Sequence, residues 1–542
     1  MPAGHDTTIP DVTINDKPRQ PVADPTLGIP VVVDRTGVPA NRLVTIGDSL
    51  THGFMSGAIS RTDRSWPALV ARELGLGTGF RYPTYEPPDG PGGLPVDIER
   101  LVRGLGDRVG DKVDWHEMVG ALRWARRHLD RIEDYWERGD GTKVPTTPGP
   151  YHNLAVYGAD LLDVLMLDAD IVADRLAKEP PKDSFLVPQV DRDNDRAWRV
   201  VLESCRDRGG VARTVVEAAG AMGEEGVTRA PGDGGTSHGI ETLVVVLGAN
   251  HALGSVVRLN PKWTSAKYGA LDETEKFARK GAYNVWQPAH FAEEWALVAA
   301  QLRTVRARHV ILATVPQVTI APIARGIGKR PKGSRYFPHY TRPWIDDDDF
   351  DVGHDQSITS DVARTIDSAI DAYNEAIIAS VAAARRDGLD WYVFDMGGML
   401  DSLAYRRYGS VPDSERPTWW QPYPLPPELA ALRPAPPDTR FYRSGPDGRT
   451  QGGLISLDGV HPTTIGYGLV AHEVIRIMST CAGVEFRAGD GSLRAAPGVD
   501  FGRLLPLDAL ASDPPAGFSS MLGLLGWLDE AVDWVDRVVP FR

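Results

Sequence analysis

Five short runs of Val, Ile, Leu and other apolar residues constrain the fold most, because each run is continuous and does not alternate with polar residues. Continuous runs of this length are typical of parallel strands that are buried on both faces of a sheet. Between them, apolar residues recur with helical spacing. This alternation predicts a three-layer α/β/α fold with a central parallel sheet. Strands are expected at residues 43–46, 153–157, 242–247, 309–315 and 391–395, and helices at 66–74, 211–222, 292–306 and 361–386.

The composition is that of a globular protein. The chain has 542 residues, of which 42% are hydrophobic and 24% charged, so it can bury a large core. A net charge of −14 without a sustained basic run argues against a nucleic-acid partner. The two cysteines, Cys205 and Cys481, argue against a disulfide framework and a cysteine-based metal site. No apolar run approaches the ~20 residues of a membrane span, so we expect no integral membrane segment.

The N-terminal residues are rich in proline and aspartate and lack the basic start and apolar core of a secretory signal. We therefore expect no export signal and a cytoplasmic location, with export by a route other than Sec left open. Residues 1–40 are expected to form an extended arm that lies on the body or is disordered.

The rest of the chain divides into a main domain, residues 41–482, and a C-terminal extension, residues 483–542. The main domain carries insertions near residues 80–150, 322–357 and 400–455, which are rich in aromatic residues. These aromatics could line a channel for acyl chains, stack on sugar rings, or pack the loops onto the body.

The C-terminal extension contains apolar residues at spacings of three or four, from Phe518 to Val539, opposite an acidic face. Membrane-surface helices usually carry Lys and Arg on the polar face. We therefore expect an amphipathic helix that packs on the body or on a second subunit in a homo-oligomer.

Small and polar residues follow the predicted strands where a parallel sheet places its ligand-binding edge. Ser49 follows the first strand, within "GDSL", and Gly158 follows the second. Asn250 follows the third strand, and its carboxamide can donate to a negative oxygen. Asp458 and His461 lie three residues apart in "DGVHPT", so one turn can bring the carboxylate to the imidazole. Each residue taken alone could instead be a turn former, a helix cap or a surface histidine.

In order and position, these four blocks resemble the SGNH (GDSL) hydrolase superfamily over residues 41–480. The resemblance implies that Ser49 is the nucleophile, His461 the general base and acid, and Asp458 the residue that orients His461. It implies an oxyanion hole formed by the backbone N–H groups of Ser49 and Gly158 and by the Asn250 side chain.

The same resemblance implies a flavodoxin-like sheet of about five strands and no metal or organic cofactor. This chain departs from the family pattern in one place, because His251 follows Asn250 where the family often has Asp. We expect a serine hydrolase acting on a small-molecule ester, either an acyl ester or an acetylated carbohydrate. An acyltransferase and a non-catalytic ligand-binding protein on the same scaffold remain alternatives.

Other residues near these blocks invite rival interpretations. Ser237 lies in "GTSHG", which matches the nucleophile elbow of α/β-hydrolases, but that elbow requires a strand before the serine and here the strand follows it. His52 and His251 are expected at the rim of the pocket or just behind it. The acidic run Asp346–Asp351 could ligate calcium but lacks the spacing of a calcium loop, so a solvated acidic loop is expected.

Overall fold

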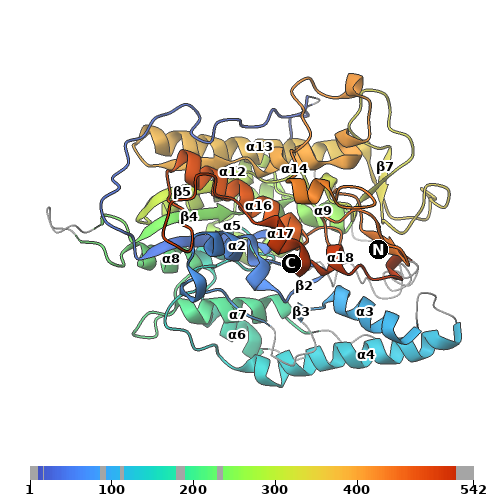
Figure 1. Ribbon diagram of the computed structural model, residues 1–542, viewed down its shortest axis with the longest axis horizontal. Helices are drawn as coiled ribbons and strands as arrows, with labels where there is room; N and C mark the ends of the chain where they lie inside the picture. The colour runs from blue at the N-terminus through green and yellow to red at the C-terminus, as the bar shows by residue number, and fades with distance from the viewer. Residues whose placement is uncertain are drawn as a thin grey trace.

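A central sheet of four parallel strands organises the computed structural model, which describes residues 10–15, 17–85, 93–109, 115–178, 190–228 and 236–519 (Figure 1). In spatial order the strands are β1 (Asn41–Gly47), β4 (Ile240–Val246), β5 (Ala307–Ala313) and β9 (Trp391–Phe394). Thr45 lies opposite Val244, Val244 opposite Ile311, and Ile311 opposite Tyr392, so one register runs across the sheet.

Both faces of the sheet are packed, as the continuous apolar runs predict. Alternate residues of a strand point to opposite faces, so Val44 and Val245 join one core cluster whereas Leu43 and Val244 join the other. The first cluster is covered by α5 (Leu161–Met166), α8 (Val215–Gly223), α12 (Pro288–Leu302) and α13 (Ser360–Arg386). The second is covered by α2 (Trp66–Glu73) and α16 (Thr464–Arg476).

Residues 153–157, which were expected to form a strand, do not form a strand of the central sheet. Their backbone runs parallel to β1, and the Leu154 N–H donates to the Thr45 carbonyl (2.9 Å), but only one bridge forms, between Thr45 and Asn153. The pairing ends because the chain turns at Val156, whose carbonyl accepts from the Ala159 N–H (3.2 Å). Positive φ at Gly158 completes this turn.

Two expected helices have different boundaries from those predicted. The helix expected at 211–222 begins at Val215, because Thr214 and Glu217 form a reciprocal capping box that fixes its start. The helix expected at 292–306 begins at Pro288, where the proline ring suits the first helical turn. The helices expected at 66–74 and 361–386 lie within a residue of the prediction at each end.

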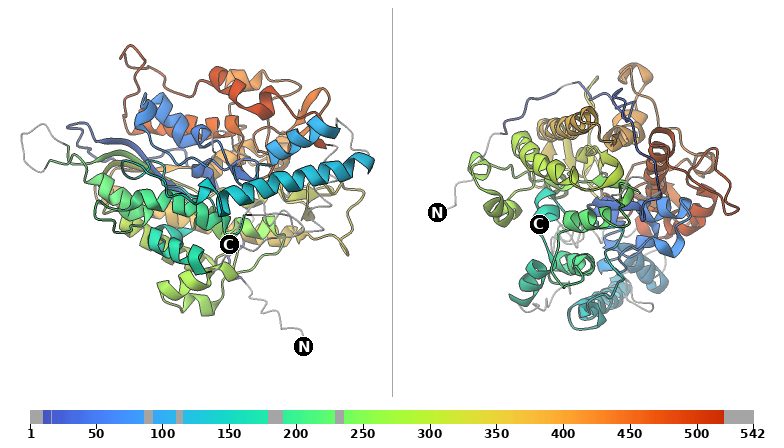
Figure 2. Two further views of the ribbon diagram at one scale, coloured as in Figure 1. Left: turned by 90° about the horizontal axis from the view of Figure 1, so that it is seen from below. Right: turned by 90° about the vertical axis from the view of Figure 1, so that its left-hand side faces the viewer.

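The insertions add peripheral structure around the sheet. The first contains β3 (Leu94–Pro95), which pairs with β2 (Ala58–Ile59), followed by α3 (Ile98–Val109) and α4 (Trp115–Glu137). Helix α4 lies along the lower margin of the molecule in Figure 1 and, in cyan, at the bottom of the right-hand view of Figure 2. Further helices of the periphery are α6 (Ala169–Lys178), α7 (Asp193–Cys205) and α14 (Met396–Leu403). Short strands outside the central sheet are β6 (Arg325–Ile327), β7 (His339–Thr341), β8 (Ile358–Thr359), β10 (Arg443–Gly445) and β11 (Gly448–Gln451). Helices α6 and α7 pack on each other, β6, β7 and β8 form a small antiparallel sheet, and β10 and β11 pair as a hairpin.

The N-terminal arm covers the outer edge of the sheet beside β9. The Pro25 carbonyl accepts from the Val393 N–H (2.9 Å), which occupies a donor on this edge strand. Asp395, just after β9, accepts from the Val22 N–H (2.6 Å) and forms an ion pair with Arg19. The described part of the arm is thus fixed to the carboxyl end of β9.

The C-terminal extension packs on the body as far as Phe518. Its helices α17 (Phe501–Leu504) and α18 (Ala509–Ser512) lead to Phe518, which is fully buried beside Phe441 and Tyr442. Most of the predicted amphipathic helix, from residue 520 onward, lies outside the described residues. Among the helices that are described, none has the length and apolar character needed to cross a membrane.

Candidate active site

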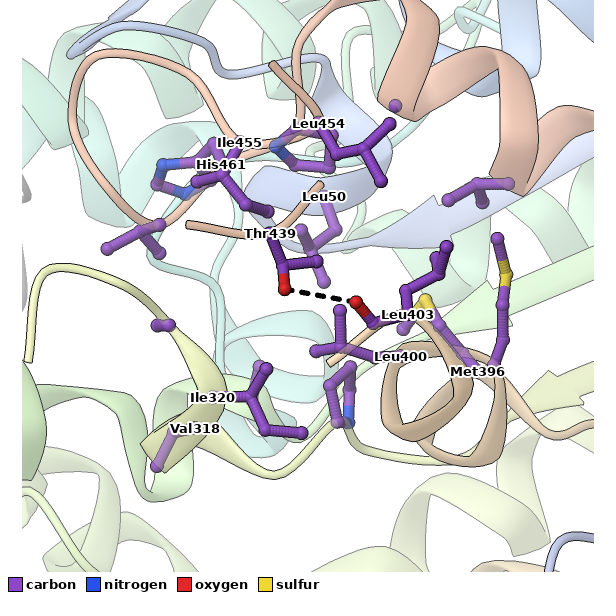
Figure 3. A pocket seen from close by; sticks show the side chains of 18 of the residues that line it. Leu50, Val318, Ile320, Met396, Leu400, Leu403, Thr439, Leu454, Ile455 and His461 are labelled. Atoms are coloured by element: carbon purple, nitrogen blue, oxygen red, sulfur yellow. Dashed lines mark hydrogen bonds between the residues drawn. The ribbon is translucent and has the colours of Figure 1, made fainter. Parts of the chain in front are cut away.

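A cavity of about 110 Å³ opens where the four parallel strands end. Every strand leads to its lining: Ser49 and Leu50 follow β1, Ala249 follows β4, Ile320 follows β5, and Met396 follows β9. This is the edge at which open α/β sheets bind ligands. Figure 3 shows the apolar side chains of the lining. Those labelled there are Leu50, Val318, Ile320, Met396, Leu400, Leu403, Leu454 and Ile455, together with Thr439 and His461.

Ser49 lies at the first position of the short helix α1 (Ser49–His52), directly after β1. Asp48 caps this helix, and its Oδ1 accepts from the Leu50 N–H (3.0 Å). The first N–H of a helix has no partner within the helix, and the Ser49 N–H donates no other hydrogen bond among the described residues. Ser49 therefore brings both a hydroxyl and a free backbone donor to the cavity.

Asp458 and His461 form a tightly held pair. Asp458 Oδ2 accepts from His461 Nδ1 (3.0 Å) and from the Gly57 N–H (3.0 Å), while Oδ1 accepts from the Val460 N–H (2.8 Å) and the His461 N–H (2.9 Å). Burial by itself raises the pKa of Asp458, but the charge and hydrogen bonds of His461 outweigh it and hold that pKa below its ordinary value. An ionised carboxylate only accepts, so Nδ1 carries the proton and Nε2 presents a lone pair.

Ser49 and His461 line the same cavity, as the sequence predicts. Both residues are buried apart from this opening, and Phe54 packs against the imidazole with ring centroids 4.6 Å apart. The Ser49 hydroxyl makes no hydrogen bond to His461 in this structure. Such contacts are often long in unliganded enzymes and tighten when substrate binds.

The other two predicted oxyanion donors lie next to each other. Gly158 has φ +74°, and its N–H has no hydrogen-bond partner within the described chain. Asn250 Nδ2 donates to the Ala159 carbonyl (2.8 Å), which joins the turn after β4 to the turn that contains Gly158. A carboxamide nitrogen has two hydrogens, so Asn250 keeps a second donor. Neither residue lines the cavity of Ser49 directly.

Neither of the two histidines expected at the rim of the pocket or just behind it lies on the rim, because both are buried. His52 is fully buried, its Nδ1 accepts from the Tyr157 N–H (3.0 Å), and burial lowers its pKa to about 3, so it is neutral and structural. His251 is also fully buried, between Trp286 and Phe291, with Nε2 3.5 Å from Glu294 Oε2. Apolar packing by residues distant in sequence places both rings in the core.

Two residues that sequence reasoning missed also shape the site. The Tyr467 hydroxyl, on α16, donates to the Phe54 carbonyl (2.6 Å) and lies 3.4 Å from the Ser49 carbonyl, which fixes α1 against α16. Asp48 has a buried Oδ2 with no hydrogen-bond partner among the described residues, and burial raises its pKa to about 7. The "GDSL" motif contains Asp48 and could have marked it as a residue of the site, whereas no local sequence pattern marks Tyr467.

Ser237 lies at the opposite edge of the sheet, just before β4. Its hydroxyl is 2.7 Å from Nδ1 of the adjacent His238 and donates to Asp34 Oδ2 (3.4 Å), so it has no part in the Asp458–His461 pair. The strand that follows it leads away toward Asn250, which agrees with the rejection of the nucleophile-elbow interpretation.

Two aspartates of the acidic run have arginine partners. Asp346 lies 3.6 Å from Arg443, and Asp347 pairs with Arg325. No cluster of three or more His, Cys, Asp or Glu side chains suited to a metal ion occurs in the described part of the chain. The aromatic side chains described in the three insertions do not line the cavity of Ser49, and Trp136 packs against Tyr85.

The buried carboxyl of Asp48 predicts a pH dependence of stability. Folded Asp48 keeps its proton up to about pH 7, whereas the unfolded chain releases it near the ordinary aspartate pKa of 3.8. The folded state therefore binds more protons between these values, and the contribution of Asp48 to stability falls as the pH rises through this window. Asp48→Asn keeps the capping oxygen without the charge. The unfolding free energy of Asp48→Asn minus that of wild type should rise by about 2–4 kcal/mol between pH 4 and pH 8, as measured by urea denaturation.

The matched control is Asp413→Asn, which alters an aspartate whose side chain is 92% exposed and should leave the pH dependence unchanged. Equal pH dependence in wild type and Asp48→Asn would contradict the buried proton on Asp48.

Comparisons of this chain with protein-family models, curated proteins and solved structures found no match.

Proposed function

We propose that this protein is a serine hydrolase of the SGNH type that cleaves carboxylic esters through an acyl-enzyme. The observation that carries the proposal is the buried Asp458–His461 pair, whose histidine lines the same cavity as Ser49. Of the four hydrogen bonds to Asp458, the one from His461 Nδ1 favours the imidazole tautomer that a general base requires, and the three from backbone N–H groups hold the carboxylate in place.

In this proposal Ser49 Oγ attacks the ester carbonyl carbon while His461 Nε2 takes the hydroxyl proton. Asp458 stabilises the imidazolium that forms. The N–H groups of Ser49 and Gly158 and the free Asn250 donor stabilise the tetrahedral oxyanion. His461 then protonates the departing alcohol, and water activated by the same imidazole hydrolyses the acyl-enzyme.

The arrangement of the sheet supports the SGNH proposal. Residues 152–156 run parallel to β1 on its free side, in the position of a fifth strand. With this segment included, the order becomes 152–156, β1, β4, β5, β9, which is the order of flavodoxin-like folds.

The lining of the cavity favours an apolar acyl group over an acetyl group. Leucine, isoleucine and methionine side chains of α14 and of the segments around Ile320 and Leu454 face the space beside His461 (Figure 3). Burying methylene groups against such a lining stabilises binding by ≈0.8 kcal/mol each. The acyl chain of the ester is therefore assigned to this cavity.

Substitution of Ser49 tests the proposed nucleophile. Ser49→Ala removes the only oxygen that would bond to substrate, so kcat should fall by a factor on the order of 10³ or more, with p-nitrophenyl acyl esters as substrates. Ser237→Ala is the control and should change kcat/KM by less than about threefold. Full activity in Ser49→Ala, or its loss in Ser237→Ala, would assign the reaction to another serine.

Asn250→Ala tests the proposed oxyanion hole. Loss of this donor should lower kcat by a factor on the order of 10² to 10³ with little change in KM. Asn260→Ala alters an exposed asparagine ten residues along the chain and should have no effect on either constant. An Asn250→Ala enzyme within about twofold of wild type would exclude this side chain from the oxyanion hole.

A further inference from the structure

A second cavity, of about 490 Å³, lies next to the cavity of Ser49. It is lined by residues of β6 and β7, by the segment that follows α14, and by the segment around Thr439. Ile320, Pro322 and Thr439 line both cavities, so the two spaces adjoin at these residues. In Figure 3 Thr439 lies between His461 and α14, with its hydroxyl directed to the Leu403 carbonyl (3.1 Å).

The two cavities differ sharply in chemistry. The first is lined mainly by aliphatic side chains, whereas six arginines and a single carboxylate, that of Asp346, line the second. The arginines are Arg325, Arg335, Arg406, Arg407, Arg440 and Arg443.

Four of these arginines have carboxylate partners nearby. The pairs are Arg325 with Asp347, Arg407 with Asp367 and Asp401, Arg440 with Asp438, and Arg443 with Asp346. Arg335 and Arg406 form no ion pair with any described residue. Arg406 donates to the Gly326 carbonyl (2.6 Å) and stacks on Phe337, while the three nitrogens of Arg335 have no hydrogen-bond partner in the described parts of the chain.

The buried guanidinium of Arg335 destabilises the fold unless an anion compensates its charge. It is only 7% exposed, and a buried cation without hydrogen bonds is destabilising. Burial alone lowers its pKa, but Tyr336 and Asp367 outweigh this effect, so the guanidinium stays charged. Arg335 thus contributes positive charge to the cavity wall.

Arg406 is the second arginine of this wall whose charge has no carboxylate partner among the described residues. Burial, reinforced by the charge of Arg325, lowers the pKa of Arg406 to about 10. A cation that is destabilised in this way is stabilised by an anion. The planar guanidinium fork matches the oxygens of phosphate and carboxylate groups.

We propose that the second cavity binds an anionic group on the alcohol part of the substrate, while the acyl chain occupies the cavity of Ser49. The substrate class is then an amphiphilic ester, with an apolar acyl chain and an alcohol that carries an oxyanion such as phosphate. This inference rests on the proposed ester hydrolysis for its substrate, but the anion site itself does not depend on catalysis.

Two esters of identical acyl chain test the substrate class: a monoacylglycerol and the corresponding monoacylglycerol phosphate. Wild type should show a kcat/KM at least about tenfold higher for the phosphorylated ester. Arg406→Gln should lose this preference and keep its activity on the neutral ester within about twofold. Arg330→Gln is the matched control, because Arg330 also stacks on Phe337 and donates to a backbone carbonyl but does not line the cavity.

Calorimetric titration with inorganic phosphate, at constant ionic strength, tests the anion site without any turnover. Wild type and Arg330→Gln should bind phosphate, and Arg406→Gln should bind it at least about tenfold more weakly. Because the wild-type titration needs no variant, it decides the question even if Arg406→Gln fails to fold.

The outcomes separate the two proposals. Phosphate binding without hydrolysis of any ester would support the anion site and overturn the hydrolase. Hydrolysis without charge preference and without phosphate binding would overturn the anion site alone. Phosphate binding with equal turnover of both esters would overturn the assignment of this anion to the substrate.

Discussion

The carboxylate of Asp458 is the point on which the geometry of the candidate site depends. It is buried and accepts four hydrogen bonds, three of them from backbone N–H groups of Gly57, Val460 and His461. These bonds hold the turn before α16 against the segment that follows α1. Because the same carboxylate orients the imidazole, one buried charge both joins the two segments and sets the tautomer of the proposed base.

The parallel sheet explains why Ser49, Asn250 and the other residues that follow its strands gather beside the Asp458–His461 pair. Parallel strands end at a common edge, so whatever follows β1, β4, β5 and β9 gathers there. The proposed oxyanion donors are brought together in the same way, since Asn250 after β4 donates to Ala159 in the turn beside β1. A change of packing at this edge would therefore disturb the proposed nucleophile, base and oxyanion donors together.

Much of this arrangement could be predicted because its causes are local. Continuous apolar runs mark β1, β4, β5 and β9, and the three-residue spacing of Asp458 and His461 allows one turn to pair them. The segment at 153–157 has the same apolar pattern but turns at Val156, so the pattern predicts a full strand where the structure has an edge segment with little pairing. Helix starts such as Val215 depend on capping bonds that hydrophobic spacing does not reveal.

What could not be predicted arises from contacts between distant segments. Three of these features depend on how α1 packs against α16 and residues 153–157. They are the burial of His52, the hydrogen bond from Tyr467 to Phe54, and the buried oxygen of Asp48 that has no hydrogen-bond partner among the described residues. The arginine-lined cavity likewise combines Arg325, Arg406 and Arg443 from three separate segments. These segments belong to the insertions, so in this account the sheet supplies the reacting groups and the insertions supply the recognition of substrate.

The most direct test of the central claim is to find the atom that a fluorophosphonate modifies. The reagent forms a phosphorus–oxygen bond to an activated serine and releases fluoride, so tandem mass spectrometry of the digested protein identifies the residue. The account predicts one adduct, on the peptide that contains Ser49, and none in the His461→Ala variant. An adduct on Ser237, or labelling of Ser49 that persists unchanged without His461, would contradict it.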